Sequence, residues 1–205
     1  MELADYKSIT VAVTKNRSDE EIKRIYAQGY HVLAENRVQE LEKRQQLALP
    51  QVSWQLIGHL QSNKVRKAVT YCSLIQSVDS EKLLRLIERE AARQNKVMDV
   101  LLQVNIAQED TKFGFQSDEV KPVINRVADL KHVSIKGIMV IGPHVDDAEK
   151  IRAVFLKGKQ LFDELKNLQQ DNVEMKYLSM GMSSDWPIAL ECGSNMLRIG
   201  RSLFE

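Results

Sequence analysis

The sequence is poor in the residues that cross-link, kink or loosen a chain, with 2 Cys, 4 Pro and 9 Gly among 205 residues. Cys72 and Cys192 each stand far from any other cysteine, which excludes a disulfide framework or a zinc knuckle. We expect both to be small buried hydrophobic side chains. With 43% apolar and 28% charged residues, the composition also excludes a disordered or low-complexity chain. The length favours a single domain that spans residues 1–205.

Long apolar runs are missing too. The longest stretches, at 100–104 and 138–141, are far shorter than the roughly 18 residues that a membrane-spanning helix needs. The N-terminus MELADYKS is polar rather than a signal peptide, so we expect a cytoplasmic protein with no membrane partner. A net charge of +1 provides no global field that would attract nucleic acid. Any anion site must therefore be local.

Several catalytic patterns are absent. The sequence contains no HExxH, GxxxxGK[ST], GxSxG or GxGxxG motif. Its four histidines, His31, His59, His132 and His144, lack the spacing of metal ligands. We therefore expect neither a metal site nor nucleotide hydrolysis.

What the sequence does contain is a regular alternation of apolar, β-branched runs with amphipathic stretches, which is typical of parallel strands joined by crossover helices. Eight strands are predicted, at residues 9–14, 30–33, 54–57, 74–76, 97–104, 135–141, 175–178 and 196–199. Helices are predicted at residues 18–28, 38–47, 62–69, 80–94, 118–130, 146–170 and 184–191. This pattern favours an α/β fold, a single (β/α)₈ TIM barrel. The alternative is an open doubly wound sheet.

In such a barrel the functional site lies at the carboxyl ends of the strands. Lys15 directly follows the first predicted strand, where partial desolvation would make its amine a nucleophile suited to Schiff-base chemistry. The alternative for Lys15 is a solvated loop residue. Asn36 follows the second strand and is either a hydrogen-bond donor to a ligand oxygen or a helix cap.

The segment from Tyr177 to Phe204 predicts a phosphate site between the seventh and eighth strands. Ser183, Ser184 and Asp185 open a predicted helix, so that hydroxyls and free backbone N–H groups face a common point. Gly200 lets the backbone approach a ligand closely. Arg198 and Arg201 add positive charge. The serines could equally be simple N-caps, and the cluster Lys64, Arg66 and Lys67 is either an anionic contact or a solvated helix face.

Five segments of the sequence together resemble a known family. They are VAVTK at 11–15, ENRVQE at 35–40, WQLIGHLQSNK at 54–64, LLQVNIAQEDTKFGF at 101–115, and LSMGMSSDW followed by MLRIGR near the end. In this order they resemble the pyridoxal phosphate (PLP) homeostasis proteins, which are similar to the barrel domain of alanine racemase. The resemblance covers essentially the whole chain.

The resemblance implies that Lys15 holds PLP as an aldimine and that Asn36 lies near the cofactor ring. It also implies that Ser179, Gly200 and Arg201 hold the phosphate, and that Arg198 approaches the pyridine nitrogen. Arg201 stands where relatives carry a threonine, but its backbone N–H can still donate. An arginine at the pyridine nitrogen makes the ring a poorer electron sink.

Three functions stay open at this point. The leading hypothesis is a PLP carrier or regulator in vitamin B6 and amino-acid homeostasis, which hands PLP to apo-enzymes and is not itself an enzyme. The second is a PLP enzyme such as an amino-acid racemase, which would need a second acid/base group; the racemase relatives take that group from a further domain. The third is an interaction protein in which Lys15 stays unmodified. The sequence does not fix the oligomeric state, and we expect a monomer.

Overall fold

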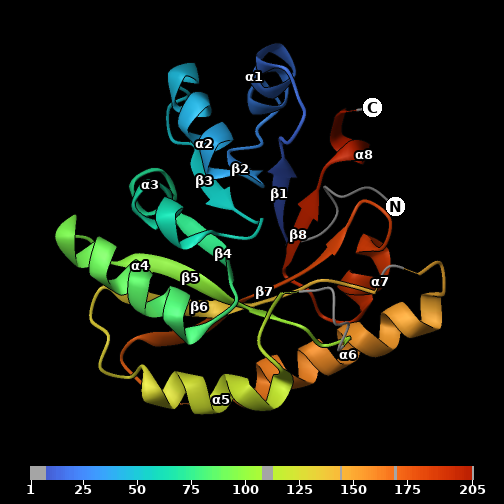
Figure 1. The fold of residues 1–205 in the computed structure, drawn as a ribbon. Helices are drawn as coiled ribbons and strands as arrows, with labels where there is room; N and C mark the ends of the chain where they lie inside the picture. The colour runs from blue at the N-terminus through green and yellow to red at the C-terminus, as the bar shows by residue number, and fades with distance from the viewer. Residues whose placement is uncertain (1–7, 108–112, 144, 169, 205) are drawn as a thin grey trace.

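Eight parallel strands close into a barrel in the order of the sequence, and β1 pairs with β8 through Ala12 and Ile199 (Figure 1). The computed structural model describes residues 8–107, 113–143, 145–168 and 170–204. The strands are β1 Ile9–Val13, β2 Val32–Glu35, β3 Ser53–Leu56, β4 Leu74–Val78, β5 Met98–Val104, β6 Val133–Val140, β7 Val173–Met182 and β8 Met196–Ile199. The predicted barrel is confirmed, and the open sheet is excluded because β1 and β8 are hydrogen bonded.

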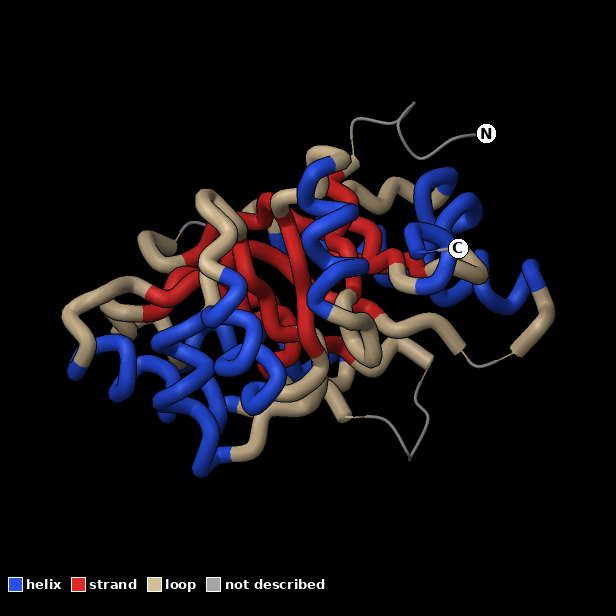
Figure 2. The backbone as a smooth tube through the Cα atoms, turned by 90° about the horizontal axis from the view of Figure 1, so that it is seen from above, coloured by secondary structure: helices blue, strands red, loops and turns tan. Residues whose placement is uncertain are grey.

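Helices surround the strands, which gather at the centre of the molecule when it is seen from above (Figure 2). They are α1 Asp19–Ala27, α2 Val38–Arg44, α3 Val65–Tyr71, α4 Glu81–Arg93, α5 Ser117–Arg126, α6 Ala148–Leu165, α7 Trp186–Glu191 and α8 Arg201–Phe204, with 3-10 turns η2 Gln45–Leu47 and η3 Ser62–Lys64. None of the helices in the described part of the chain is long and apolar enough to cross a membrane.

The helices predicted from residues 18 and 80 are confirmed, with Ser18 and Ser80 as the N-caps of α1 and α4. The Ser18 hydroxyl accepts from the Glu21 N–H at 3.2 Å, and the Glu21 carboxylate accepts from the Ser18 N–H at 2.7 Å. The Ser80 hydroxyl caps α4 by accepting from the Leu83 N–H at 3.3 Å. These side chains satisfy backbone donors that the first turn of a helix leaves without partners.

Several boundaries near the barrel mouth differ from the prediction. Strands β4 and β7 run on to Val78 and Met182, beyond the predicted ends at residues 76 and 178. Strand β2 runs on to Glu35, which had been expected beyond the strand end at Leu33. Helix α7 begins at Trp186 rather than Ser184, because the Asp185 carboxylate accepts from the Met182 N–H at 2.6 Å and holds residues 182–185 in a turn. The short helix α8 was not predicted from the sequence.

The core has two parts, because successive side chains of a barrel strand point alternately outward and into the barrel. Outward-facing side chains such as Ala12, Leu178 and Leu197 pack against the helices. A smaller cluster of inward-facing side chains fills the barrel: Val11, Ala34, Leu74, Leu101, Met139 and Met196. Cys72 and Cys192 are buried and free, as predicted. Burial raises the pKa of the Cys72 thiol to about 12.

Candidate functional site

A layer of buried polar side chains lies on top of the apolar filling of the barrel. Gln76, Ser179 and Arg198 each follow an inward apolar residue by two positions, so they point into the barrel nearer the carboxyl ends of their strands. Arg198 Nη1 donates to Ser179 Oγ at 2.8 Å, and Ser179 Oγ donates to Gln76 Oε1 at 2.6 Å. Gln76 Nε2 donates to Gln55 Oε1 at 2.6 Å. The four side chains form one hydrogen-bonded chain across the barrel.

Arg198 is the charged member of this layer and is only 5% exposed. Its two hydrogen-bond partners, Ser179 Oγ and the Val140 carbonyl oxygen at 2.9 Å, are both neutral. Burial lowers the pKa of the guanidinium to about 10, and the nearby Asp185 carboxylate opposes that shift. A buried cation without a hydrogen-bonded carboxylate is costly in a folded chain, and this cost is typical of a site that binds an anionic or polar ligand.

Backbone donors gather where β7 and β8 end. The Gly200 N–H donates to Ser183 Oγ at 3.2 Å, which joins the two strand ends and leaves the Ser183 hydroxyl proton free. The backbone N–H groups of Ser183, Ser184 and Arg201 have no acceptor among the described residues. Gly181, at φ +97°, has no room for a side chain, because a Cβ there would lie 2.6 Å from Ala189 Cβ.

Lys15 lies beside this group of donors. Strand β1 is the neighbour of β8, and an added Cβ on Gly200 would lie 3.7 Å from Val13 Cβ, two residues before Lys15. The Lys15 side chain is exposed. It lines a cavity of about 430 Å³ together with Asn16, Arg17, Glu35, Asn36, Arg37, Glu40 and Arg44. The structure therefore brings Lys15, Asn36 and Gly200 to the same mouth of the barrel.

The loop that carries Lys15 is tied to strand β2. Thr14 Oγ1 donates to Glu35 Oε1 at 2.7 Å, and Arg44 Nε donates to the same oxygen at 3.2 Å. Arg44 also donates to the Arg17 carbonyl at 2.7 Å. Burial raises the pKa of the Glu35 carboxyl, while the bonds from Thr14 and Arg44 oppose that shift. This network fixes the backbone on both sides of Lys15.

The remaining predicted site residues lie as follows. Ser179 is fully buried, and its single hydroxyl proton is already donated to Gln76, so its predicted phosphate contact stays a prediction. Arg201 is exposed at the start of α8. Gln76 was missed as a site residue, although its inward position two residues after Leu74 is visible in the strand pattern. His144 lies outside the described residues, and no group of described His, Cys, Asp and Glu residues is arranged to hold a metal ion.

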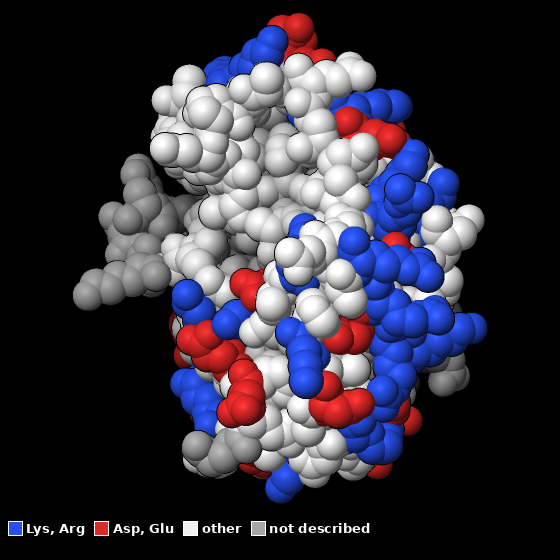
Figure 3. Space-filling model, turned by 90° about the vertical axis from the view of Figure 1, so that its left-hand side faces the viewer, with Lys and Arg blue, Asp and Glu red and all other residues white. Residues whose placement is uncertain are grey.

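The net charge of +1 is not spread evenly. On the side of the molecule that carries α3 and α4, Lys and Arg side chains gather along one edge, with fewer Asp and Glu among them (Figure 3). Within the predicted basic cluster, Lys67 pairs with Glu42 at 2.7 Å, whereas Lys64 and Arg66 have no ion partner among the described residues. Positive potential is therefore local, as the sequence required.

Comparison with known proteins defines the class to which this barrel belongs. Residues 2–205 match the family model of the alanine racemase N-terminal domain. The structure superimposes on alanine racemase of Clostridium difficile with a TM-score of 0.77 and 16% identity, covering 99% of this chain and 52% of that one. At this identity the likeness shows the fold alone.

Relatives of higher sequence identity define the family within this class. The pyridoxal phosphate homeostasis proteins of Helicobacter pylori (strain 26695) and Aquifex aeolicus are 38% and 37% identical over 95% of this chain and over 86% and 85% of their own lengths. The chain belongs to this family, as its sequence motifs indicated. PipY of Synechococcus elongatus, solved without PLP, has a TM-score of 0.91 at 36% identity, covering 97% of this chain and 93% of that one. PipY has also been solved with PLP bound, with a TM-score of 0.88 at 35% identity and the same coverage.

Proposed function

We propose that this chain is a PLP-binding protein that holds the cofactor on Lys15 and takes part in vitamin B6 and amino-acid homeostasis. The observation that carries the proposal is Arg198, a buried cation bonded only to neutral oxygens at the end of the barrel where Lys15 stands. The names of the relatives and the PLP-bound structure of PipY support the same ligand.

The residues at the mouth fit the three parts of PLP. The free N–H groups of Ser183, Ser184 and Arg201, with the Ser183 hydroxyl, offer donors to a phosphate. The exposed Lys15 amine is on the adjacent strand end. Arg198 is on β8, which lies between β7 and β1 in the closed barrel. Its guanidinium suits a polar atom of the cofactor ring.

Each residue has a distinct task in this proposal. PLP supplies an aldehyde that reacts reversibly with an amine, and a ring that can accept electrons. Lys15 provides the amine, and the Thr14–Glu35–Arg44 network keeps its loop in place. Asn36 lines the same cavity as Lys15 and offers a carboxamide to the ring substituents. Arg198 disfavours protonation of the pyridine nitrogen, because a second positive charge next to the guanidinium is unfavourable.

The test is borohydride reduction of the protein after incubation with PLP, followed by peptide mapping. The pyridoxyl group is expected on Lys15. Lys15→Ala is expected to lose the absorption band of bound PLP and to keep its far-UV circular dichroism spectrum, whereas Lys23→Ala, which removes an exposed lysine of α1, keeps the band. A pyridoxyl group mapped to a different lysine contradicts the proposal.

We further propose that the chain is a carrier rather than an enzyme, a cytoplasmic monomer that gives PLP to apo-enzymes. The family name supports a role in homeostasis. Size-exclusion chromatography with light scattering tests the monomer. Transfer of PLP to an added apo-enzyme, followed by the activity that the acceptor regains, tests the carrier role.

A further inference from the structure

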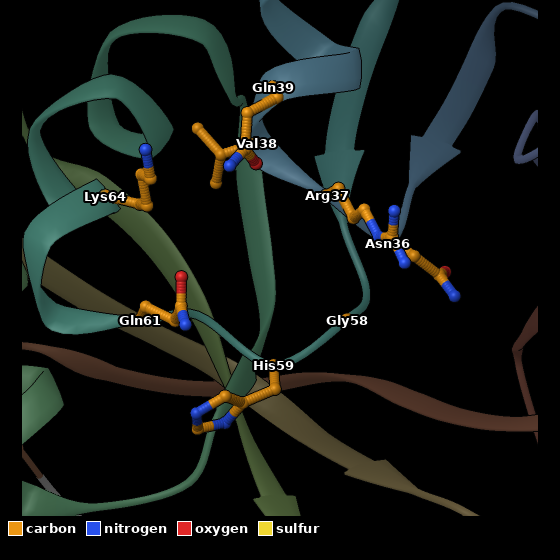
Figure 4. A pocket seen from close by; sticks show the side chains of 8 residues that line it. All are labelled: Asn36, Arg37, Val38, Gln39, Gly58, His59, Gln61 and Lys64. Atoms are coloured by element: carbon orange, nitrogen blue, oxygen red, sulfur yellow. The ribbon is translucent and has the colours of Figure 1, made fainter.

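A second pocket opens next to the Lys15 cavity at the carboxyl ends of β2 and β3. It has a volume of about 490 Å³ and is lined by Asn36, Arg37, Val38, Gln39, Gly58, His59, Gln61 and Lys64 (Figure 4). Asn36 and Arg37 line both cavities, so the two are neighbours. The residues of the proposed phosphate site, on β7 and β8, are not part of its lining.

The lining carries two cations and no carboxylate. Neither Arg37 nor Lys64 has an ion partner among the described residues, and Lys64 is half-buried. The nearby carboxylates have other partners: Glu40 bonds Lys43 at 3.0 Å, and Glu42, which Lys64 influences electrostatically, bonds Lys67 at 2.7 Å. The Asp79 carboxylate, which bonds His59 of the lining, offsets only one of the two cations, so the pocket has a net positive charge that favours an anion.

The other polar groups of the pocket suit the same kind of ligand. His59 Nδ1 donates to Asp79 Oδ2 at 2.8 Å, and its ring stacks on Phe113 with the centroids 4.0 Å apart. These contacts fix the imidazole, and Nε2 has no partner among the described residues. Asn36, Gln39 and Gln61 add carboxamide donors. Gly58 lets the ends of β2 and β3 pack closely, because an added Cβ would lie 2.2 Å from the Asn36 carbonyl oxygen.

We propose that this pocket binds the carboxylate of a small amino acid or oxo acid beside Lys15. The Arg37 guanidinium lies beside Asn36, on the side that both cavities share, and its planar shape matches the geometry of a carboxylate (Figure 4). Lys64 lies on the opposite side of the pocket and adds positive charge at a greater distance. This proposal rests on the proposed function. A ligand held in this pocket would place its amino or oxo group next to the cavity in which Lys15 holds PLP. Amino acids and oxo acids share the carboxylate, and the experiment separates them.

The test measures binding of L-alanine, pyruvate, L-alaninamide and inorganic phosphate to the full chain by saturation-transfer NMR titration, before and after loading with PLP. At least one of L-alanine and pyruvate is expected to bind, and the one that binds identifies the ligand as an amino acid or an oxo acid. Arg37→Gln is expected to weaken this binding about tenfold. Lys64→Gln, which removes a charge farther from the carboxylate, is expected to weaken it by a smaller factor. Arg66→Gln, which removes an exposed cation of α3 outside the pocket, is expected to leave it unchanged.

Four results overturn the proposal: no binding of either acid, equal binding of L-alaninamide, tighter binding of phosphate than of either acid, or equal weakening by Arg66→Gln. Borohydride trapping of PLP in parent and Lys64→Gln protein keeps the two proposals separate. If PLP is trapped on Lys15 in both proteins but no acid binds, the pocket proposal fails alone. If no PLP is trapped in the parent, the proposed function fails.

Discussion

At the scale of single residues, the buried row of hydrogen-bonded side chains from Arg198 to Gln55 distinguishes the role of Ser179 from that of Ser183. The sequence alone could not make this distinction. Both residues carry a hydroxyl, Ser179 within β7 and Ser183 directly after its end. Ser179 is fully buried between Arg198 and Gln76, whereas Ser183 is half-buried and contacts the Gly200 N–H. A phosphate needs donors, and only the Ser183 hydroxyl has a proton that is not already donated to another side chain.

We therefore predict that Ser183→Ala weakens PLP binding more than Ser179→Ala. Loss of one donor to a charged acceptor costs about 1.5 to 3 kcal/mol, which corresponds to roughly a ten- to hundredfold change in affinity. Titration with PLP, followed by absorbance, measures both variants against the parent. The reverse order of affinities would assign the phosphate contact to Ser179 and leave Ser183 as a turn residue.

Gln76 acts on the site through Ser179 and Arg198, as a positioning residue. Gln76→Leu removes the acceptor of the Ser179 hydroxyl, so we expect the free energy of unfolding to fall by about 1 to 3 kcal/mol. Because Gln76 then no longer holds the Ser179 hydroxyl that accepts from Arg198, the pH dependence of the bound-PLP absorption band should shift in the same direction as in Arg198→Gln.

Urea denaturation and spectra across pH measure the two effects of Gln76→Leu. The control is Gln55→Leu, which leaves the Ser179–Gln76 and Arg198–Ser179 bonds in place and should change the band little. An unchanged pH dependence in Gln76→Leu would show that the glutamine only fills the barrel.

At the scale of elements, Glu35 links strands β1 and β2 with helix α2. Its carboxylate accepts from Thr14 at the end of β1 and from Arg44 at the end of α2. The side chain is 1% exposed, and burial raises its pKa above the ordinary value of a glutamate. The link that holds the Lys15 loop therefore includes a carboxylate whose ionised form is disfavoured by the fold.

This raised pKa predicts a pH-dependent stability. A carboxyl whose folded pKa exceeds its unfolded value of about 4.3 contributes most at low pH, and its contribution falls as pH rises through the folded pKa. The free energy of unfolding of the parent, relative to Glu35→Gln, should therefore decrease as pH rises from about 4.5 toward neutral. Urea denaturation at several pH values measures this difference.

Glu21→Gln provides a contrast of opposite sign. The Ser18 backbone N–H lowers the pKa of Glu21, so the contribution of Glu21 is present above its unfolded pKa and is lost as pH falls. A difference for Glu35→Gln that grows with pH would mean that the bonds from Thr14 and Arg44 outweigh burial.

At the scale of the whole molecule, the closed barrel places β1, β7 and β8 around one mouth, so that Lys15 lies on the strand next to the one that carries the buried Arg198. Amino-acid racemisation needs an acid/base group on each face of the PLP ring, and Lys15 provides one of them. Under the proposed function, Arg198 also limits the ring as an electron sink. Both features favour holding PLP over turnover.

We therefore predict negligible alanine racemase or transaminase turnover by the PLP-loaded chain. The loss of one positioned acid/base group alone costs roughly 10²- to 10⁴-fold in rate. Coupled assays for D-alanine and for oxo-acid products measure this. Substantial turnover that disappears in Lys15→Ala would overturn the carrier proposal. A simultaneous loss in His59→Ala, but not in His31→Ala, would identify His59 as the second acid/base group.

The sequence by itself determined the alternation of strands and helices, the helix starts near residues 18 and 80, and the family. These features depend on local patterns: apolar alternation, capping residues and motifs read along the chain. The sequence favoured the barrel over an open sheet, and the pairing of β1 with β8 decided between them. It also placed Lys15 at a strand end, because strand ends are visible where an apolar run stops.

The tertiary structure decided which side chains face each other across the barrel. Gln76 and Ser179 are 103 residues apart, and only closure of the barrel brings them within 2.6 Å. The pocket of Arg37, His59 and Lys64 likewise exists because the ends of β2 and β3 lie side by side. Hydrogen bonds and charge compensation between distant residues depend on this packing, and a linear pattern does not contain it.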